Sequence, residues 1–204
     1  MYNFIIMKKV IVFATSNKNK VKEVREMVEP FDIEILSLSD LDLEVTHPED
    51  SETFEGNAKI KAEDIASKCD YPVLSDDSGL SINALNGFPG VHSARFMEGK
   101  PYVEKNRAIL EMMKGIKDRK ASFYTAMAYI DKKNGVEKVF FGENAGEITT
   151  DLDPNPVSGF GYDPIFYSYD LNKTFGQTTS EEKDSVSHRG RALREFIKYL
   201  EKGE

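Results

Sequence analysis

Short apolar runs alternate with stretches of helical periodicity along the first third of this chain. Lys9–Ala14 and Tyr71–Leu74 are continuous apolar runs rich in strand formers, a pattern typical of strands buried in a sheet. Between them, apolar residues recur at helical spacing from Val21 to Val28 and again over residues 53–68, which predicts two helices. The segment between these helices, residues 33–38, has the pattern of another strand. The order β-α-β-α-β predicts an α/β fold.

The pattern continues with a helix, a hairpin and two further helices. Apolar spacing predicts a helix over 102–113, and the long β-branched and aromatic run 121–131 predicts a strand. Asn134-Gly135 is a strong hairpin signal, so 136–141 should be the returning strand. Capping residues predict a short helix from Thr179 and a last helix that begins after Ser187.

The stretch Ser75-Asp76-Asp77-Ser78-Gly79 contains the most distinctive polar pattern. It follows an apolar run and includes a glycine, so we predict that the two acids lie at the end of a strand, where open α/β sheets bind ligands. Neighbouring strand residues point to opposite sides, so Asp76 and Asp77 should have different roles. One could hold a divalent metal while the other orients water or caps the turn. The dipeptide alone favours an ordinary turn with two solvated acids, because Asp-Asp-Ser-Gly is common in turns, and only the rest of the chain changes that interpretation.

Two loops carry further candidate groups. The loop Thr15–Lys20 joins a strand to a helix and offers hydroxyls, amides, lysines and free N–H groups, which suits an anion. It lacks the P-loop pattern, and a helix cap with solvated lysines explains it as well. Residues 151–163 form the longest irregular stretch, in which Phe160 and Tyr162 flank a glycine. These aromatic rings could stack on a base or simply fix the loop to the core.

Composition narrows the function classes. The chain has 204 residues and a net charge of −8, which argues against broad nucleic-acid binding. A single cysteine excludes an internal disulfide. No linker, repeat or membrane span is evident, so we predict one domain over 1–204 in the cytoplasm, with residues 1–6 a dispensable extension.

Six motifs in order resemble the inosine/xanthosine triphosphate pyrophosphatase family. They are TSNKNK, FEGNAKIKA, SDDSGL, NGFPG followed by HSAR, GFGYDPIF, and EEKDSVSHRGRA, and they extend over nearly the whole chain. The resemblance implies Mg²⁺-dependent hydrolysis of deaminated purine nucleoside triphosphates (ITP, dITP and XTP) to the monophosphate and pyrophosphate. It also implies a homodimer, and an elongated, mixed, twisted sheet with flanking helices whose active site lies in a cleft between two lobes.

The resemblance also implies roles for individual residues. Asp77 takes the metal and catalytic role, and Glu49 matches an acidic metal ligand. Ser78 lies at the substrate. The triphosphate would be held by Thr15, Ser16, Asn17, Lys18, Asn19, Lys20 and Lys61. The base and sugar would meet Phe160, Gly161, Tyr162 and Asp163, and the purine would meet Lys183, His188 and Arg189. Near Glu49 the sequence departs from the family pattern, because Ser51 stands in place of a glycine and Gly56 in place of an acid.

These implied roles are chemically consistent. Mg²⁺ prefers carboxylate, water and phosphate oxygens, and a protein of negative charge needs it to hold a triphosphate. Water would attack the α-phosphorus, oriented by the second oxygen of Asp77 or by Asp76. Hypoxanthine and xanthine carry an acceptor oxygen at position 6, and Arg189 and His188 can donate to it, whereas adenine has a donor there.

Two other functions fit parts of the sequence. An enzyme of similar fold could hydrolyse pyrimidine or modified nucleoside triphosphates, although the Ser187-His188-Arg189 pattern favours purines. A nucleotide-binding sensor without turnover would have no need of Asp76, Asp77 and Glu49 together. Pyrophosphate release measured with and without Mg²⁺ separates an enzyme from a sensor.

Overall fold

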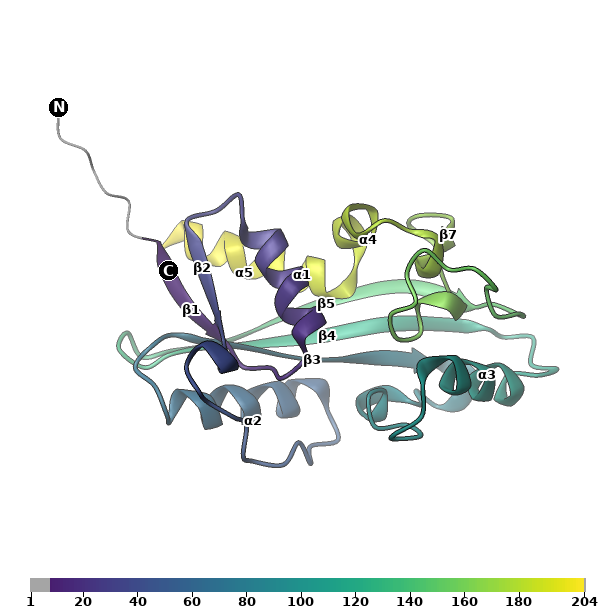
Figure 1. Cartoon of the computed structure of the whole chain (residues 1–204), viewed down its shortest axis with the longest axis horizontal. Coiled ribbons are helices and arrows are strands. Elements are labelled where there is room, and N and C mark those ends of the chain that lie inside the picture. The colour runs from purple at the N-terminus through teal and green to yellow at the C-terminus, as the bar shows by residue number, and fades with distance from the viewer. Residues whose placement is uncertain (1–7, 204) are drawn as a thin grey trace. The chain divides into compact units, whose positions relative to one another are not determined.

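The computed structural model describes residues 8–203 and has the predicted α/β architecture (Figure 1). The strands are β1 (Lys9–Phe13), β2 (Ile33–Ser37), β3 (Val73–Ile82), β4 (Lys120–Asp131), β5 (Val136–Ile148), β6 (Phe166–Ser168) and β7 (Lys173–Thr174). The helices are α1 (Lys18–Val28), α2 (Phe54–Ala66), α3 (Tyr102–Met112), α4 (Ser180–Val186) and α5 (His188–Lys202). None of the helices in this range is long and apolar enough to cross a membrane.

The described strands form one mixed sheet in the order β2-β1-β3-β4-β5-β6-β7. β1 pairs in parallel with β2 and β3, whereas β5 pairs antiparallel with β6 and β6 with β7. The mixed sheet and the hairpin at Asn134-Gly135 confirm the predictions from sequence. The sequence pattern did not predict β6 and β7, because strands of three and two residues are too short to show a period.

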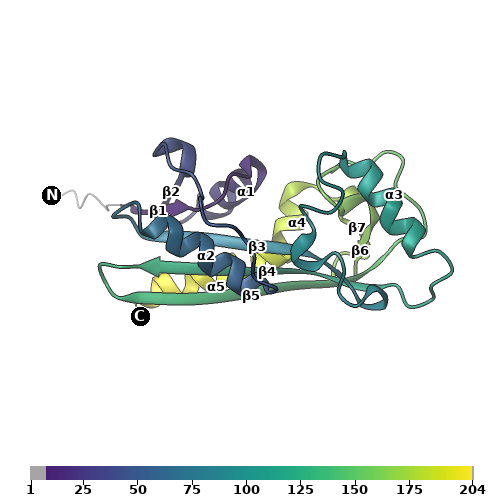
Figure 2. The ribbon, with the colours of Figure 1, turned by 90° about the horizontal axis from the view of Figure 1, so that it is seen from below.

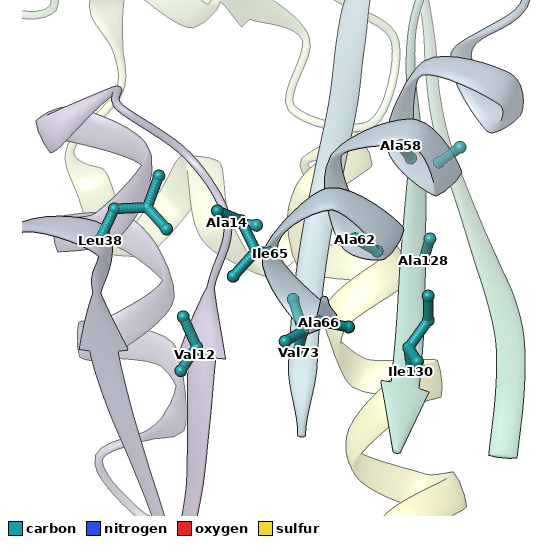
Figure 3. Packing of buried hydrophobic residues seen from close by; sticks show 11 residues of the cluster. Val12, Ala14, Leu38, Ala58, Ala62, Ile65, Ala66, Val73, Ala128 and Ile130 are labelled. Carbon is teal, nitrogen blue, oxygen red and sulfur yellow. The ribbon is translucent and has the colours of Figure 1, made fainter. Parts of the chain in front are cut away.

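The chain divides into two compact units. The first comprises the described residues up to Asp77 together with Ala126–Phe140, and the second comprises Ser78–Thr125 and Phe141 onward. In the first unit α1 and α2 lie on opposite sides of the strands (Figure 1), and Figure 2 shows α2 from below, in front of them. Small residues of α2 let the helix pack closely on the sheet. The labelled core residues in Figure 3 are Val12, Ala14, Leu38, Ala58, Ala62, Ile65, Ala66, Val73, Ala128 and Ile130.

The second unit has its own aromatic core. Phe123 packs edge-on against Phe166 with ring centroids 4.7 Å apart, and Phe175 stacks on Phe123 at 5.9 Å. The two C-terminal helices begin where the caps were predicted. Thr179 caps α4 with a reciprocal capping box, and the Ser187 hydroxyl accepts the N–H of Gly190 at the start of α5.

The prediction that the two acids lie at a strand end, or in a turn, is wrong. β3 continues through Asp76 and Asp77 to Ile82. Gly79 does not end the strand. Instead, it admits a neighbouring segment, because a Cβ at this position would lie 2.3 Å from the carbonyl oxygen of Gly90. The neighbouring strand β1 is shorter: it ends at Phe13 and pairs with β3 only through Val73 and Leu74. Both acids therefore lie beyond the carboxyl end of β1.

Candidate functional site

Asp77 lies in a group of polar side chains contributed by α2 and the loop before it. The Asn57 side-chain amide donates a hydrogen bond of 3.0 Å to Asp77 Oδ2. The Lys61 ammonium lies 3.9 Å from Asp77 Oδ1 and donates a 2.7 Å hydrogen bond to Glu49 Oε2. Asn57 and Lys61 reach the same group because residues four apart project from one helix face. One ammonium thus contacts two carboxylates.

The environment of Asp77 shifts the pKa of its carboxyl upward. Burial raises the pKa of the Asp77 carboxyl above its ordinary value, although Lys61, Lys20 and the Asn57 hydrogen bond act in the opposite direction. Its side chain nevertheless keeps 12% of its surface exposed, which leaves room for water to reach it. A buried carboxylate with a raised pKa and limited solvent contact is typical of a general base.

Asp76 has different partners from its neighbour, as the pleat of the strand predicts. Its side chain is fully buried, and the Lys20 ammonium of α1 lies 3.0 Å from each of its oxygens. Asp77 meets groups of α2, on the other side of the strands (Figure 1). The prediction that the two acids face different sides is therefore confirmed.

The loop before α1 forms an N-terminal cap. The Asn17 side chain accepts hydrogen bonds from the backbone N–H groups of Asn19 and Lys20, and the Thr15 hydroxyl accepts the N–H of Asn17. Ser16, Lys18 and Asn19 are exposed. The loop therefore has both features weighed from the sequence, a cap on the helix and exposed polar groups that could meet an anion.

The two departures from the family pattern near Glu49 are in contact with each other. A Cβ on Gly56 would lie 2.0 Å from Ser51 Oγ and 2.7 Å from Ser51 Cβ, so the serine occupies the space that a side chain at 56 would need. The Ser51 N–H donates to Asn57 Oδ1 at 3.0 Å. The loop that carries Glu49 is therefore held against α2 despite the substitutions.

Glu49 and Asp77 are the two carboxylates of this group that could hold a divalent cation. The Lys61 ammonium lies 2.7 Å from Glu49 and 3.9 Å from Asp77, so both carboxylates meet the same positive charge. Within residues 8–203, no group of three or more His, Cys, Asp or Glu side chains could hold a metal, so an ion here needs further ligands. Mg²⁺ suits this set, because it commonly binds through one or two carboxylates and completes its shell with water and phosphate oxygens.

In the second unit, Lys183 lies between a carboxylate and aromatic rings. Its ammonium donates a 2.7 Å hydrogen bond to Asp163 Oδ2, and both side chains are buried. The same ammonium lies 5.2 Å from the ring centroid of Phe160 and 5.6 Å from that of Phe175. The Ser158 hydroxyl also donates to Asp163, at 3.0 Å. This arrangement holds the half-buried Phe160 ring beside a fixed positive charge.

His188 and Arg189, both predicted to meet the purine, lie at the start of α5 in the second unit. Arg189 is 3% exposed, and its guanidinium donates a 3.1 Å hydrogen bond to the Ser78 hydroxyl. The His188 ring stacks on Phe123 at 4.9 Å. A Cβ on Gly142 would lie 1.9 Å from the carbonyl oxygen of His188, so β5 approaches the start of the helix closely and fixes it.

The two aromatic residues of the long loop differ in accessibility. Tyr162 is 3% exposed, donates a 2.7 Å hydrogen bond to the carbonyl of Ser93, and packs edge-on against Tyr102 at 5.5 Å. Its ring belongs to the core, whereas that of Phe160 is half-buried. Of the two candidates for stacking, the geometry favours Phe160.

Sequence reasoning missed two amides that position these groups. Asn57 lies between Asp77 and the Glu49 loop, and its signals in the sequence were its place in the motif FEGNAKIKA and its spacing of four from Lys61. Asn106 of α3 donates a 3.2 Å hydrogen bond to the carbonyl of Gly161, next to Phe160. No local pattern could have identified Asn106, because this contact joins residues 55 positions apart.

Comparison with known proteins gives matches over nearly the full length. The Ham1 family model matches residues 11–199. A protein named dITP/XTP pyrophosphatase from Leptospira interrogans is 41% identical over 196 residues, 95% of this chain and 98% of that protein. A protein of the same name from Thermococcus kodakarensis is 41% identical over 191 residues, covering 93% of this chain and 96% of that one. The solved structure of the Staphylococcus aureus Ham1 protein aligns with a TM-score of 0.85 at 34% identity, covering 96% of this chain and all of that one.

Proposed function

This chain belongs to the Ham1 family, and we propose that it hydrolyses the deaminated purine nucleoside triphosphates dITP, ITP and XTP to the monophosphate and pyrophosphate. Relatives that share 41% of their residues over nearly their whole length are named for dITP and XTP. The main structural support for metal-assisted phosphate chemistry is that the Lys61 ammonium contacts both Glu49 and Asp77. The reaction would remove deaminated nucleotides from the cellular pool.

The first unit's polar group would bind the phosphates. Glu49 and Asp77 would hold Mg²⁺, which would neutralise phosphate charge and polarise the α-phosphate. Lys61 and Lys20 would contact phosphate oxygens, together with the exposed polar groups of the loop 15–20. Positioning and charge stabilisation would then supply most of the catalysis.

Asp77 is the better candidate to orient the attacking water. Its side chain keeps 12% of its surface exposed, whereas Asp76 is fully buried against Lys20. The water oxygen would bond to the α-phosphorus, the bond from that phosphorus to the bridging oxygen would break, and pyrophosphate would leave with the bond's electron pair. The proton of the water would pass to the second oxygen of the Asp77 carboxylate, the one that does not hold Mg²⁺. Asp76 would act by holding Lys20 in place.

The second unit's polar group would select the base. Phe160 would supply a stacking surface, and stacking accepts any base. His188 and Arg189 offer donors to the oxygen at position 6 of hypoxanthine or xanthine, and adenine would leave those donors unpaired. Lys183, Asp163, Gly161 and Ser78 would form the surroundings of the base and sugar. Ser78 follows Asp77 directly in the chain.

A direct assay tests this function. Pyrophosphate release should be measured for dITP, XTP, dATP, dGTP and dCTP, each with Mg²⁺ and with excess EDTA. We expect rapid release from dITP and XTP that depends on Mg²⁺, with kcat/KM for dATP lower by orders of magnitude. Equal rates for all five nucleotides would contradict the proposed base selection, and binding without release would identify a sensor.

We also propose that the enzyme is a homodimer, as the resemblance implies. Size-exclusion chromatography with light scattering should give a mass of twice 23.1 kDa. A mass that stays at 23.1 kDa across micromolar concentrations would contradict this proposal.

A further inference from the structure

The loop that carries Glu49 lies in an extended path along one face of α2. Asn57, Lys61 and Asp64 of α2 form this face, and Lys68, two residues beyond the end of the helix, continues it at the same spacing. Each contacts the loop, in reverse order along the chain: Lys68 meets residues 44 and 46, Asp64 meets 46 and 47, Lys61 meets 49, and Asn57 meets 51. We call residues 44–51 the α2 strap.

Asp64 makes the densest set of contacts with the strap. Its buried carboxylate, whose side chain is 1% exposed, accepts the Thr46 N–H at 2.7 Å and the Thr46 hydroxyl at 3.1 Å. His47 Nδ1 lies 2.6 Å from Asp64 Oδ1, and the Lys68 ammonium lies 3.0 Å from Oδ2. Lys68 also donates to the Glu44 carbonyl at 2.9 Å and to the Thr46 hydroxyl at 2.8 Å. The proposed reaction uses none of these contacts.

Burial alone would raise the pKa of the Asp64 carboxyl. The Thr46 backbone N–H, together with Lys68, His47 and the Thr46 hydroxyl, outweighs that effect, and the pKa is lowered from its ordinary value. Asp64 therefore stays ionised, and its hydrogen bonds are of the stronger, charge-assisted kind. A contact set of this strength holds the backbone at residues 46 and 47 in one position.

Only Pro48 separates this anchored point from Glu49. Proline fixes its own φ and restricts the residue before it, so the segment from His47 to Glu49 has little conformational freedom. Fixing His47 thus fixes where the Glu49 carboxylate can lie. We propose that Asp64 is a positioning residue that places Glu49 for metal binding, although it lies outside the site itself. This inference rests on the proposed role of Glu49 as a metal ligand.

The effect should appear in Mg²⁺ affinity rather than in turnover. In Asp64→Ala, the strap loses its anchor and Mg²⁺ binding should weaken about tenfold, the lower end of what loss of a group supporting a metal ligand costs. kcat at saturating Mg²⁺ should stay within about twofold of wild type, because the change weakens the support of a metal ligand and leaves the ligand itself in place. Asp64→Asn keeps an oxygen acceptor for the Thr46 N–H and should lie between Asp64→Ala and wild type. Isothermal titration with Mg²⁺ alone measures the binding without depending on activity.

The matched control is Lys59→Ala, on the same helix. Lys59 pairs with Glu55 at 2.7 Å on the exposed side and is not part of the α2 face described above. It should leave Mg²⁺ binding unchanged. If Lys59→Ala weakens binding as much as Asp64→Asn does, general loosening of α2 explains the effect and the inference is overturned.

A double-mutant cycle with Glu49→Gln separates this inference from the proposed function. If Asp64 acts through Glu49, Asp64→Asn should have little further effect on Mg²⁺ affinity in the Glu49→Gln background. Full additivity of the two changes would overturn the inference. If Glu49→Gln alone leaves Mg²⁺ binding unchanged, the metal assignment itself fails. If Glu49→Gln weakens binding and both Asp64 variants bind like wild type, only the positioning role fails.

Discussion

The two units each contain a buried lysine that contacts carboxylate, but the surroundings of the two lysines differ. Lys61 of the first unit contacts two carboxylates, those of Glu49 and Asp77. Lys183 of the second unit contacts Asp163 and lies over the rings of Phe160 and Phe175. Two carboxylates around one cation suit a metal ion and phosphates, whereas a cation beside aromatic rings suits a planar base. The comparison therefore predicts that substitutions in the first unit change rates for all nucleotides alike, and substitutions in the second change base selectivity.

The largest effect is expected from Asp77→Asn. The amide keeps the shape of the carboxylate but cannot accept a proton and is a poorer Mg²⁺ ligand, so kcat for dITP should fall by at least about 10³-fold. Thermal unfolding followed by circular dichroism should show an intact fold. A variant with near-normal kcat at saturating Mg²⁺ would remove Asp77 from the mechanism. Asp76→Asn is the companion variant, and identical Mg²⁺ titrations for both would contradict the different roles of the two acids.

Arg189→Ala should lower selectivity more than any other single change in the second unit. Loss of its donors should reduce kcat/KM for dITP and XTP by about 10²-fold while affecting dATP much less, because a site loses most on a substrate whose polar group it was built to bind. Phe160→Ala is the matched variant and should slow all purine nucleotides together, since stacking does not depend on base identity. An Arg189→Ala enzyme that keeps the wild-type preference would place selectivity elsewhere in the unit.

Lys20→Ala and Lys61→Ala should act on the phosphates. Each should lower kcat/KM for dITP and dATP by the same factor, on the order of tenfold, because a phosphate contact carries no information about the base. Lys22→Ala is the control, since Lys22 on α1 is exposed and pairs with Glu26. If either variant changed the ratio of the two substrates tenfold, about 1.4 kcal/mol, that lysine would have to act at the base.

Gly56→Ala tests the packing that supports the loop of Glu49, the proposed metal ligand of the first unit. Alanine normally stabilises a helix by about 1 kcal/mol relative to glycine. Here its Cβ would overlap Ser51, so the free energy of unfolding should instead fall by about 1–3 kcal/mol. With Ser51→Gly in the background, Gly56→Ala should become stabilising. Urea unfolding of the four variants gives the sign directly, and a stabilising Gly56→Ala in the wild-type background would contradict the close contact.

The smallest expected effect is a change in acid stability at Asp64. Its pKa is lower in the folded chain than in the unfolded chain, so its ionised form contributes stability above the unfolded value near 4 and loses it as pH falls below that value. Asp64→Asn should therefore be less stable than wild type at pH 6, and the difference should shrink toward pH 2. Urea unfolding at pH 6, 4 and 2 measures this. A difference that stays constant across the three values would show that Asp64 has an ordinary pKa.

Local sequence determined most of the elements. The apolar run 9–14, the caps Thr179 and Ser187 and the Asn134-Gly135 turn each specify structure through neighbours within a few residues, and the structure has the expected element at each place. The opposite placement of Asp76 and Asp77 also follows from sequence alone, because the pleat of a strand alternates every residue. The six family motifs and their order along the chain could also be recognised from the sequence alone.

Tertiary structure decided whatever depends on contacts between distant residues. Gly79 looked like the end of a strand, and only the approach of the Gly90 carbonyl explains why the strand continues with a glycine in it. Tyr162 and Phe160 have equivalent sequence contexts, yet a hydrogen bond to Ser93 makes one of them a core residue. Lys61 contacts Glu49 and Asp77, and Asp64 contacts the α2 strap. Both sets of contacts exist because the strap packs along one face of α2 in the folded chain. No local pattern encodes such contacts, since each partner is chosen by packing and not by its neighbours in the chain.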